Sequence, residues 1–202
     1  MSEITIRKPQ QKRSIEKKRK IILAGLELFI KNGFYKTNTT EIAKLASVSI
    51  GTIYSYFADK KEIYIAAFEY YLNTNAIPII NQLSEIPQNT NLKTVVEAMI
   101  DTFLKLYNDT SNAMLELTTT MSLDEEISRY FCDFESQYFL KFAEVFQKRQ
   151  DTSACTTEKI YLAYTLLDLL GLENSNYKHS HINFETLKKE VAHMIINTLT
   201  SK

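Results

Sequence analysis

Apolar residues recur every three or four positions along most of this 202-residue chain, and strict alternation of apolar and polar residues is almost absent. The first spacing is typical of amphipathic α-helices, whereas alternation would have indicated half-buried strands. The sequence has only three prolines, none of them after Pro87, so little interrupts a helical chain. The pattern predicts an all-α protein of about nine helices.

Local signals delimit short helices in the first third of the chain. We expect the first helix to begin near Ser14 and to end at KNGF, where Gly33 can adopt the left-handed conformation. Asn38 and Glu41 have the spacing of a capping box, which predicts the start of a second helix.

Two further helices should follow directly. Ser49 is a suitable N-cap for a third helix over 50–57, in which Ile53 and Phe57 lie four residues apart and should face inward. Asp59 would cap a fourth helix. Longer helices are expected after Pro78, and we place them at 91–108, 112–121, 124–149, 156–171 and 183–200.

Composition is that of an ordinary folded protein, with 45% hydrophobic and 24% charged residues. No apolar run approaches the roughly 18–20 residues that span a bilayer. The basic, polar N-terminus has no apolar signal-peptide core. Cys132 and Cys155 fit a reducing compartment, in which free thiols are the rule. We therefore expect a cytoplasmic protein without disulfides.

Charge is distributed unevenly along the chain. Residues 1–61 hold 13 Lys and Arg against 5 Asp and Glu, a net charge of +8, whereas residues 62–202 hold 11 against 19, a net charge of −8. This asymmetry predicts two domains, 1–61 and 62–202, of which the first meets a polyanion. The alternative is a solvated basic tail, because RKPQQKRSIEKKRK alone supplies eight positive charges.

The stretch SVSIGTIYSYFADKK carries the strongest functional signal. Two short helices joined by a tight turn, the second opening on Ser, Gly and Thr, describe a helix-turn-helix. In this motif the start of the second helix enters the major groove, where a side chain on Gly51 would hold the backbone away from DNA. Tyrosine and threonine hydroxyls can donate hydrogen bonds to phosphate oxygens without adding charge.

The segment ILAGLELFIKNGFYKTNTTEIAKLASVSIGTIYSYFADKKEIY resembles the DNA-binding domain of TetR-family repressors. Its elements LFIKNGF, TTEIAKLA, VSIGTIYSYF and DKKEI stand in the family's order and spacing. The resemblance implies an N-terminal three-helix domain and a C-terminal helical domain that dimerises and binds a small molecule. The last 130 residues resemble the family only in helical content and length.

The resemblance also assigns DNA contacts by position. It places phosphate contacts at Thr39, Thr40, Tyr54, Tyr56 and Lys60, and the residues nearest the bases at Ser49, Ile50, Gly51 and Thr52.

Some of these residues also have structural interpretations. Tyr54 and Tyr56 could be surface aromatics that cover the core, Thr39 could serve only as a cap, and Ile50 could be partly buried against the turn.

Two residues depart from the family pattern. Ser47 stands where a turn glycine is frequent, which predicts backbone strain of up to about 1 kcal/mol. Ile50 stands where a polar or basic residue is frequent, and an isoleucine there could pack on a thymine methyl.

The C-terminal domain is rich in aromatic and methionine residues. These could be plain core, or they could together line the apolar ligand cavity that the resemblance implies. The candidates are Phe103, Tyr107, Met114, Met121, Phe134, Tyr138 and Tyr164. Asp168 lies among leucines, where an unpaired carboxylate would be costly to bury. It could meet a cationic ligand, pair across a dimer interface or face solvent, and Glu116 is a weaker case of the same kind.

Other chemistry finds little support in the sequence. The histidines at 179, 181 and 193 are too sparse to predict a metal site, and no phosphate-binding glycine loop or recognisable nucleophile occurs. We therefore expect no enzyme activity, no metal and no cofactor.

The prediction is a ligand-responsive repressor that binds an inverted-repeat DNA operator as a homodimer and is released by a small apolar or amphipathic molecule. The dimer would use helices 156–171 and 183–200, as the resemblance implies. Two alternatives remain: a nucleoid-associated or division factor of the same fold without a ligand, and a helical enzyme or lipid-binding protein whose basic N-terminus touches anionic membrane.

Overall fold

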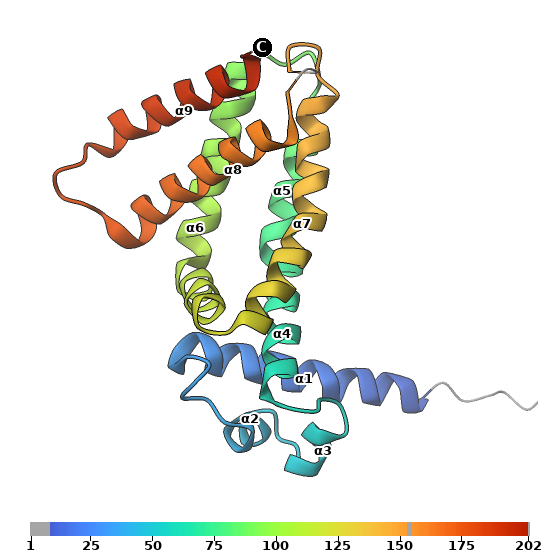
Figure 1. Cartoon of the computed structure of the whole chain (residues 1–202). Coiled ribbons are helices and arrows are strands. Elements are labelled where there is room, and N and C mark those ends of the chain that lie inside the picture. Colours follow the sequence, from blue (N-terminus) through green and yellow to red (C-terminus); the bar gives the residue numbers. More distant parts are fainter. Residues whose placement is uncertain (1–8, 153–154, 202) are drawn as a thin grey trace, which may run out of the picture. The chain divides into compact units, whose positions relative to one another are not determined.

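The computed structural model describes residues 9–152 and 155–201, and within these ranges it is all-α, as predicted (Figure 1). The α-helices are α1 (Pro9–Asn32), α2 (Thr39–Leu45), α3 (Ile50–Tyr54), α4 (Lys60–Tyr71), α5 (Ile77–Ser84), α6 (Leu92–Leu123), α7 (Glu125–Gln147), α8 (Thr157–Leu172) and α9 (Phe184–Thr200). Single π-helical turns at Leu72–Ala76 and Glu173–Tyr177 follow α4 and α8. No described helix is both long enough and apolar enough to cross a membrane.

Two helix boundaries differ clearly from the prediction, and one helix was not predicted. α1 begins at Pro9 rather than near Ser14, because proline is tolerated in a first helical turn and the following Gln, Lys and Arg are good helix formers. α3 ends at Tyr54 rather than Phe57, with Ser55 as its C-cap. α5 was not anticipated as a separate helix, although Pro78 stands in its first turn.

The predicted break at 109–111 does not exist, because α6 runs without interruption from Leu92 to Leu123. The polar residues around this position are weak helix formers, but each costs only a few tenths of a kcal/mol. Buried residues lie on both sides of the stretch, Leu106 and Tyr107 before it and Ala113 and Leu117 after it. The burial of these four side chains offsets the weak helix propensity of the polar residues around 109–111, so the helix continues.

The chain forms two compact units. Unit 1 contains the described residues up to Tyr71 together with Glu116–Ile127, and unit 2 contains Leu72–Leu115 and the described residues from Ser128 onward. The functional boundary predicted after residue 61 stays a prediction.

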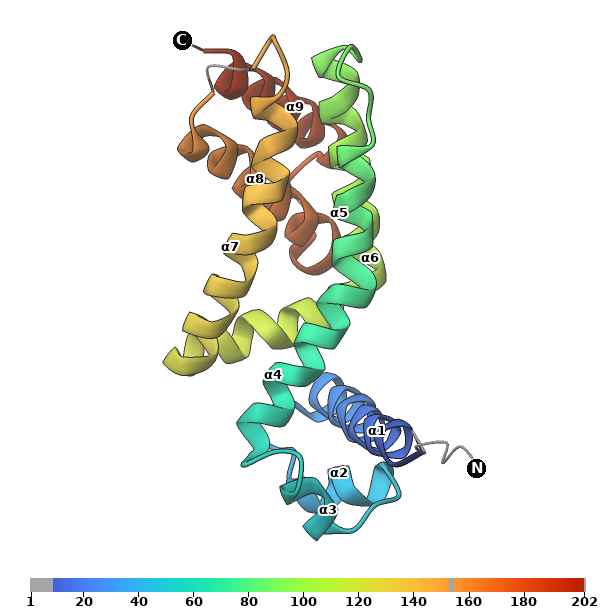
Figure 2. The same ribbon diagram turned by 90° about the vertical axis from the view of Figure 1, so that its right-hand side faces the viewer.

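Unit 1 has an aromatic core centred on Tyr64 of α4. The ring of Tyr64 lies 5.0 Å from Phe29, 5.0 Å from Phe34 and 4.6 Å from Phe68, measured between ring centroids. Burial strongly raises the pKa of Tyr64, whose hydroxyl donates a hydrogen bond to the Glu116 carbonyl at 3.4 Å. Figure 2 shows α1, α2 and α3 grouped around the start of α4.

Unit 2 is built mainly from the long helices α6, α7, α8 and α9. α8 and α9 lie side by side and are joined by the loop that follows the second π-helical turn (Figure 1). The core contains Val96, Ile100, Phe146, Ile160 and Ile195, each almost fully buried. Cys155 is a buried free thiol, and Cys132 is an exposed one.

Candidate nucleic-acid interface

The start of α2 is fixed by the predicted capping box. The Asn38 side chain accepts a hydrogen bond from the Glu41 backbone amide at 2.9 Å, and the Glu41 carboxylate accepts one from the Asn38 amide at 3.4 Å. Ile42 and Ala43 are buried on the inner face of α2. The capping box therefore satisfies the amides of Asn38 and Glu41, and the buried Ile42 and Ala43 hold α2 against the core.

The turn between α2 and α3 contains the predicted strain. Ser47 has a φ of 55°, which lies in the left-handed region that glycine adopts most easily. Gly33, at the end of α1, has the predicted positive φ of 84°. The Val48 amide donates to the Ala43 carbonyl at 3.0 Å and closes the turn.

Ser49 caps α3 as predicted. Its hydroxyl accepts a hydrogen bond from the Thr52 amide at 3.1 Å and shares another with the Thr52 hydroxyl at 2.8 Å. Ile53 and Phe57 are buried, which confirms that they hold the helix on its scaffold. The opposite side of α3 is thereby turned to solvent.

The exposed side of α3 carries most of the predicted DNA contacts. Ile50 is 41% exposed and Tyr54 is 55% exposed, so neither is a core residue. The Tyr54 hydroxyl shares a hydrogen bond with the Thr39 hydroxyl at 3.2 Å, and both groups are exposed. The interaction joins the start of α2 to the end of α3 through groups that can equally donate to a phosphate. Thr40 is exposed beside them.

Gly51 has no packing role within the chain. A Cβ added at Gly51 would meet only the Ser49 hydroxyl, at 4.0 Å, and the φ of Gly51 is not positive. Neither sterics nor backbone conformation therefore requires glycine here. If glycine is required at position 51, the requirement comes from a molecule that binds this surface.

Tyr56 connects the end of this motif to α1. Its hydroxyl shares a hydrogen bond with the Ser14 hydroxyl at 3.0 Å, and the Lys18 ammonium lies 5.4 Å from the centre of the Phe57 ring. The basic half of α1 is thus helical and lies beside the segment after α3. Sequence reasoning missed this role of Ser14 and Lys18, although their spacing of four residues places them on one helix face.

Lys60 is held by the loop between α1 and α2. Its ammonium donates to the Phe34 carbonyl at 2.7 Å and to the Thr37 carbonyl at 2.9 Å, and it lies 4.3 Å from the centre of the Phe34 ring. Burial lowers the pKa of Lys60. Two of its three donors are therefore occupied, and the assigned phosphate contact stays a prediction for the third.

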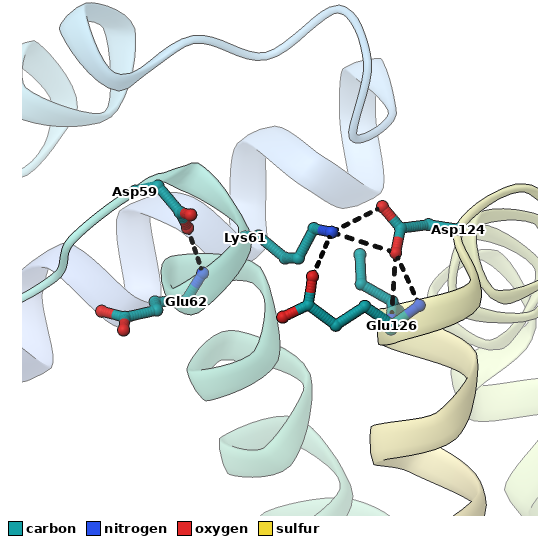
Figure 3. A network of polar contacts seen from close by, with 6 residues as sticks. Asp59, Lys61, Glu62, Asp124 and Glu126 are labelled. Carbon is teal, nitrogen blue, oxygen red and sulfur yellow. Dashed lines mark hydrogen bonds and ion pairs between the residues drawn. The ribbon is translucent and has the colours of Figure 1, made fainter.

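Lys61 is paired with two acidic residues of unit 1 (Figure 3). Its ammonium lies 3.0 Å from an Asp124 carboxylate oxygen and 2.6 Å from one of Glu126. The hydrogen bonds to Glu126 and Asp124 raise the pKa of Lys61.

Asp124 also accepts hydrogen bonds from the amides of Ile127 and Glu126 at the start of α7. The bond from Ile127 contributes most to lowering its pKa. Asp59, as predicted, accepts from the Glu62 amide at the start of α4.

The ligand candidates fall into two groups. Phe103, Tyr107, Tyr164 and Asp168 come together in unit 2, where the Tyr107 hydroxyl donates to Asp168 at 2.9 Å and the Phe103 and Tyr164 rings are 5.7 Å apart. The other candidates lie elsewhere or are not described: Met121 belongs to unit 1, Phe134 packs on Phe131 at 6.1 Å, Met114 is half-buried, and the side chain of Tyr138 lies outside the described residues.

Sequence reasoning missed two residues of this group. Glu135 accepts a hydrogen bond from the Tyr164 hydroxyl at 2.8 Å, and the Phe139 ring lies 6.1 Å from the Tyr164 ring. Their spacing of four residues on α7 was the available signal.

Glu116 takes a different role from the one suspected. Its carboxylate accepts hydrogen bonds from the Phe34 amide at 2.8 Å and the Thr120 hydroxyl at 2.9 Å, so it stabilises the end of α1 within unit 1.

Metal binding finds no candidate in the described part of the chain. No group of three or more His, Cys, Asp and Glu residues is placed there to hold an ion.

Comparison with known proteins connects this geometry to a family. Residues 21–67 match the family model described as "Bacterial regulatory proteins, tetR family". The HTH-type transcriptional regulator YerO of Bacillus subtilis is 31% identical over 121 residues, which cover 57% of this chain and 40% of YerO. The fatty acid metabolism regulator protein of B. subtilis is 43% identical over 49 residues, which cover 24% of this chain and 25% of that protein. The chain thus spans less than half the length of these curated relatives.

A solved structure extends the likeness in fold to nearly the whole chain. The fatty acid degradation regulator FadR of Bacillus halodurans superimposes with a TM-score of 0.66 at 18% identity, over 98% of this chain and all of that one. The helix-turn-helix geometry of α2 and α3 falls inside the segment matched by the family model. The family match is therefore shown for residues 21–67, the segment that contains the helix-turn-helix, and the likeness of the remaining chain is one of fold.

Proposed function

We propose that this chain is a transcriptional regulator that binds duplex DNA through α2 and α3. The observation that carries the proposal is the exposed α3 surface, where Gly51 has no internal packing role, the Thr52 hydroxyl bonds that of Ser49, and the Tyr54 hydroxyl bonds that of Thr39. A bare backbone allows close approach to the major groove, and the hydroxyls can donate to phosphates on either side. The net charge of +8 over residues 1–61 favours the same partner.

A substitution at Gly51 tests this proposal. Duplexes selected from a random library by the wild-type chain would be titrated in gel shifts with wild type, Gly51→Leu and Thr94→Leu, a control at an exposed α6 position in unit 2. We expect Gly51→Leu to weaken binding about tenfold or more, since it separates the helix from the bases. Its thermal unfolding should match that of wild type. Unchanged affinity of Gly51→Leu would contradict the proposed interface.

We further propose that the protein acts as a homodimer through α8 and α9. Large apolar side chains on these helices are exposed, including Leu162 at 56%, Leu169 at 51% and Met194 at 53%. Leu162 and Leu169 are seven residues apart and share one face of α8. A two-fold dimer would present two copies of α3 to an inverted-repeat operator.

The regulator would respond to a small molecule bound in unit 2. The cluster of Phe103, Tyr107, Tyr164 and Asp168 supports this part of the proposal, because it places polar groups among aromatic rings. Ligand binding would release the protein from its operator, so repression is the proposed direction of control.

A further inference from the structure

Two carboxylates in unit 2 are each bound by a tyrosine. The Tyr107 hydroxyl of α6 donates to one oxygen of Asp168 at 2.9 Å, and the Tyr164 hydroxyl of α8 donates to Glu135 of α7 at 2.8 Å. Asp168 and Tyr164 are four residues apart and therefore share one face of α8. Three helices thus bring two acidic groups to one place.

Close packing fixes this arrangement. A Cβ added at Gly171 would overlap the Tyr107 ring, so glycine allows α8 to approach that ring one turn after Asp168. Tyr107 is buried, and burial strongly raises its pKa, so its hydroxyl keeps its proton and remains a donor to Asp168. The hydrogen bond from Tyr107 therefore holds the Asp168 carboxylate in a defined orientation.

Neither carboxylate has a positive partner among the described residues. The ion pairs of unit 2 lie elsewhere, for example between Lys188 and Asp101 at 2.6 Å. Burial, with Glu135 nearby, raises the pKa of Asp168 to about 7 against the opposing hydrogen bond from Tyr107. Burying the Asp168 carboxylate without a cation is costly, so a positive charge beside it would stabilise its ionised form, whereas Glu135 is exposed.

The second oxygen of Asp168 remains open. Its first oxygen accepts the bond from Tyr107, and no hydrogen bond joins the other to a described residue. No fully buried side-chain oxygen or nitrogen in the described part of the chain lacks a partner. This oxygen is therefore not completely enclosed, and the Asp168 side chain as a whole is partly buried.

Aromatic rings complete the surroundings. The Tyr164 ring lies 5.7 Å from Phe103 and 6.1 Å from Phe139, with edge-to-face geometry in both pairs. Aromatic faces beside carboxylates attract organic cations, through the ring quadrupole and through the opposite charge. A hard metal ion would need more oxygen ligands than two carboxylates and phenols supply, and the described residues contain no such cluster.

We infer that unit 2 binds an organic cation, a substituted ammonium with an apolar body, whose charge pairs with Asp168 and Glu135 among the rings of Phe103, Tyr164 and Phe139. The inference rests on the proposed ligand-responsive function and names the class of its ligand. The sequence predicts a small apolar or amphipathic ligand, and this inference narrows that class to molecules with a cationic head group.

The test uses the full chain and a pair of probes of equal shape. Phenyltrimethylammonium carries the charge, and tert-butylbenzene is its uncharged isostere. Isothermal titration calorimetry at pH 8 should show the cation binding at least about tenfold more tightly than the isostere, because charge-assisted contacts exceed neutral ones by about that factor. Affinity for the cation should fall as pH drops below 7, since protonation of Asp168 removes its charge.

Substitutions assign the effect to this site. Asp168→Asn keeps an acceptor for Tyr107 but removes the charge, so it should lose about tenfold in cation affinity and much of the pH dependence. Glu135→Gln should lose a smaller factor. Asp101→Asn changes the net charge equally, at an exposed carboxylate already paired with Lys188, and should bind as wild type.

The outcomes separate this inference from the proposed function. Equal affinity for the two probes, no binding of the cation, or an Asp168→Asn variant that binds as wild type would each overturn the cation site. DNA binding is measured separately without probe, where Asp168→Asn should equal wild type. A chain that binds the cation but no duplex would sustain the cation site and refute the regulator.

Discussion

Individual residues of the helix-turn-helix divide into those that build it and those available to a partner. Ser49 caps α3, and Ile53 and Phe57 are buried in the core. Ile50 and Gly51 are exposed, and a Cβ at Gly51 would meet only the Ser49 hydroxyl. Internal contacts explain the first group by packing and capping. The second group is where DNA recognition has to be tested.

Ile50 provides the sharpest test of base recognition. If its side chain packs on a thymine methyl, replacing that thymine by uracil should cost roughly 0.5–1 kcal/mol, near the ~0.8 kcal/mol of one buried methyl-sized group. Ile50→Ala should erase this preference without abolishing binding, because the phosphate contacts remain. Competition titrations over single-base operator variants measure it. Unaltered preferences in Ile50→Ala would assign specificity to Ser49 and Thr52 instead.

Ser47 offers a test of backbone strain. Since its φ of 55° favours glycine, Ser47→Gly should raise the free energy of unfolding by up to about 1 kcal/mol. Ser55, the α3 C-cap, has a right-handed conformation, so Ser55→Gly should lower the same quantity by about 0.5–1 kcal/mol. Urea unfolding of both variants provides the comparison. A decrease in both would show that the left-handed serine carries no strain.

At the scale of elements, α1 has two distinct halves. Its second half packs in the core of unit 1 through Ile21 and Phe29, and its first half exposes a run of basic side chains beside the segment after α3. Because α1 begins at Pro9, removing residues 1–12 would also remove its first turn. Charge substitutions are therefore the cleaner probe.

We expect the exposed basic half of α1 to contact the DNA backbone. Arg13 and Lys17 adjoin Ser14 and Lys18, which face the end of the motif. The double variant Arg13→Gln with Lys17→Gln should lower the slope of log affinity against log salt by about two, since each phosphate contact contributes ~0.9. Binding to operator and to random duplex should weaken alike.

The matched control removes two exposed lysines of unit 2, Lys105 and Lys189, by the same substitutions. Its salt slope should equal that of wild type. If both double variants shift the slope equally, the effect reflects net charge, and α1 makes no specific contact. Lys60 is a poorer probe, because its loss would also release two backbone carbonyls of the α1–α2 loop.

At the scale of the whole molecule, the proposed binding to an inverted repeat requires a dimer, so the oligomeric state is the property to test. Leu169→Glu would place a carboxylate in the proposed α8–α9 interface and should raise the dimer dissociation constant about a hundredfold or more, because a buried unpaired charge costs several kcal/mol. Leu140→Glu makes the same change at an exposed position of α7 and should leave the dimer intact. Sedimentation equilibrium measures both. A Leu169→Glu variant that dimerises like wild type would exclude this face.

The sequence alone determined the features that depend on neighbours within a few residues. The capping box of Asn38 and Glu41, the cap at Ser49 and the left-handed Gly33 are confirmed, because each is a contact or a conformation set by local residue types. The inward direction of Ile53 and Phe57 follows from helical periodicity and is also confirmed.

Only the tertiary structure decided the features that depend on distant residues. α6 is continuous because burial on both sides of 109–111 outweighs weak local propensity. The two adjacent lysines of DKKEI have different partners: Lys60 bonds carbonyls 26 and 23 residues earlier, and Lys61 pairs with carboxylates 63 and 65 residues later. Asp168 meets Tyr107 across 61 residues of chain. Such contacts arise from how helices pack, and packing is a property of the folded chain that periodicity within one helix does not contain.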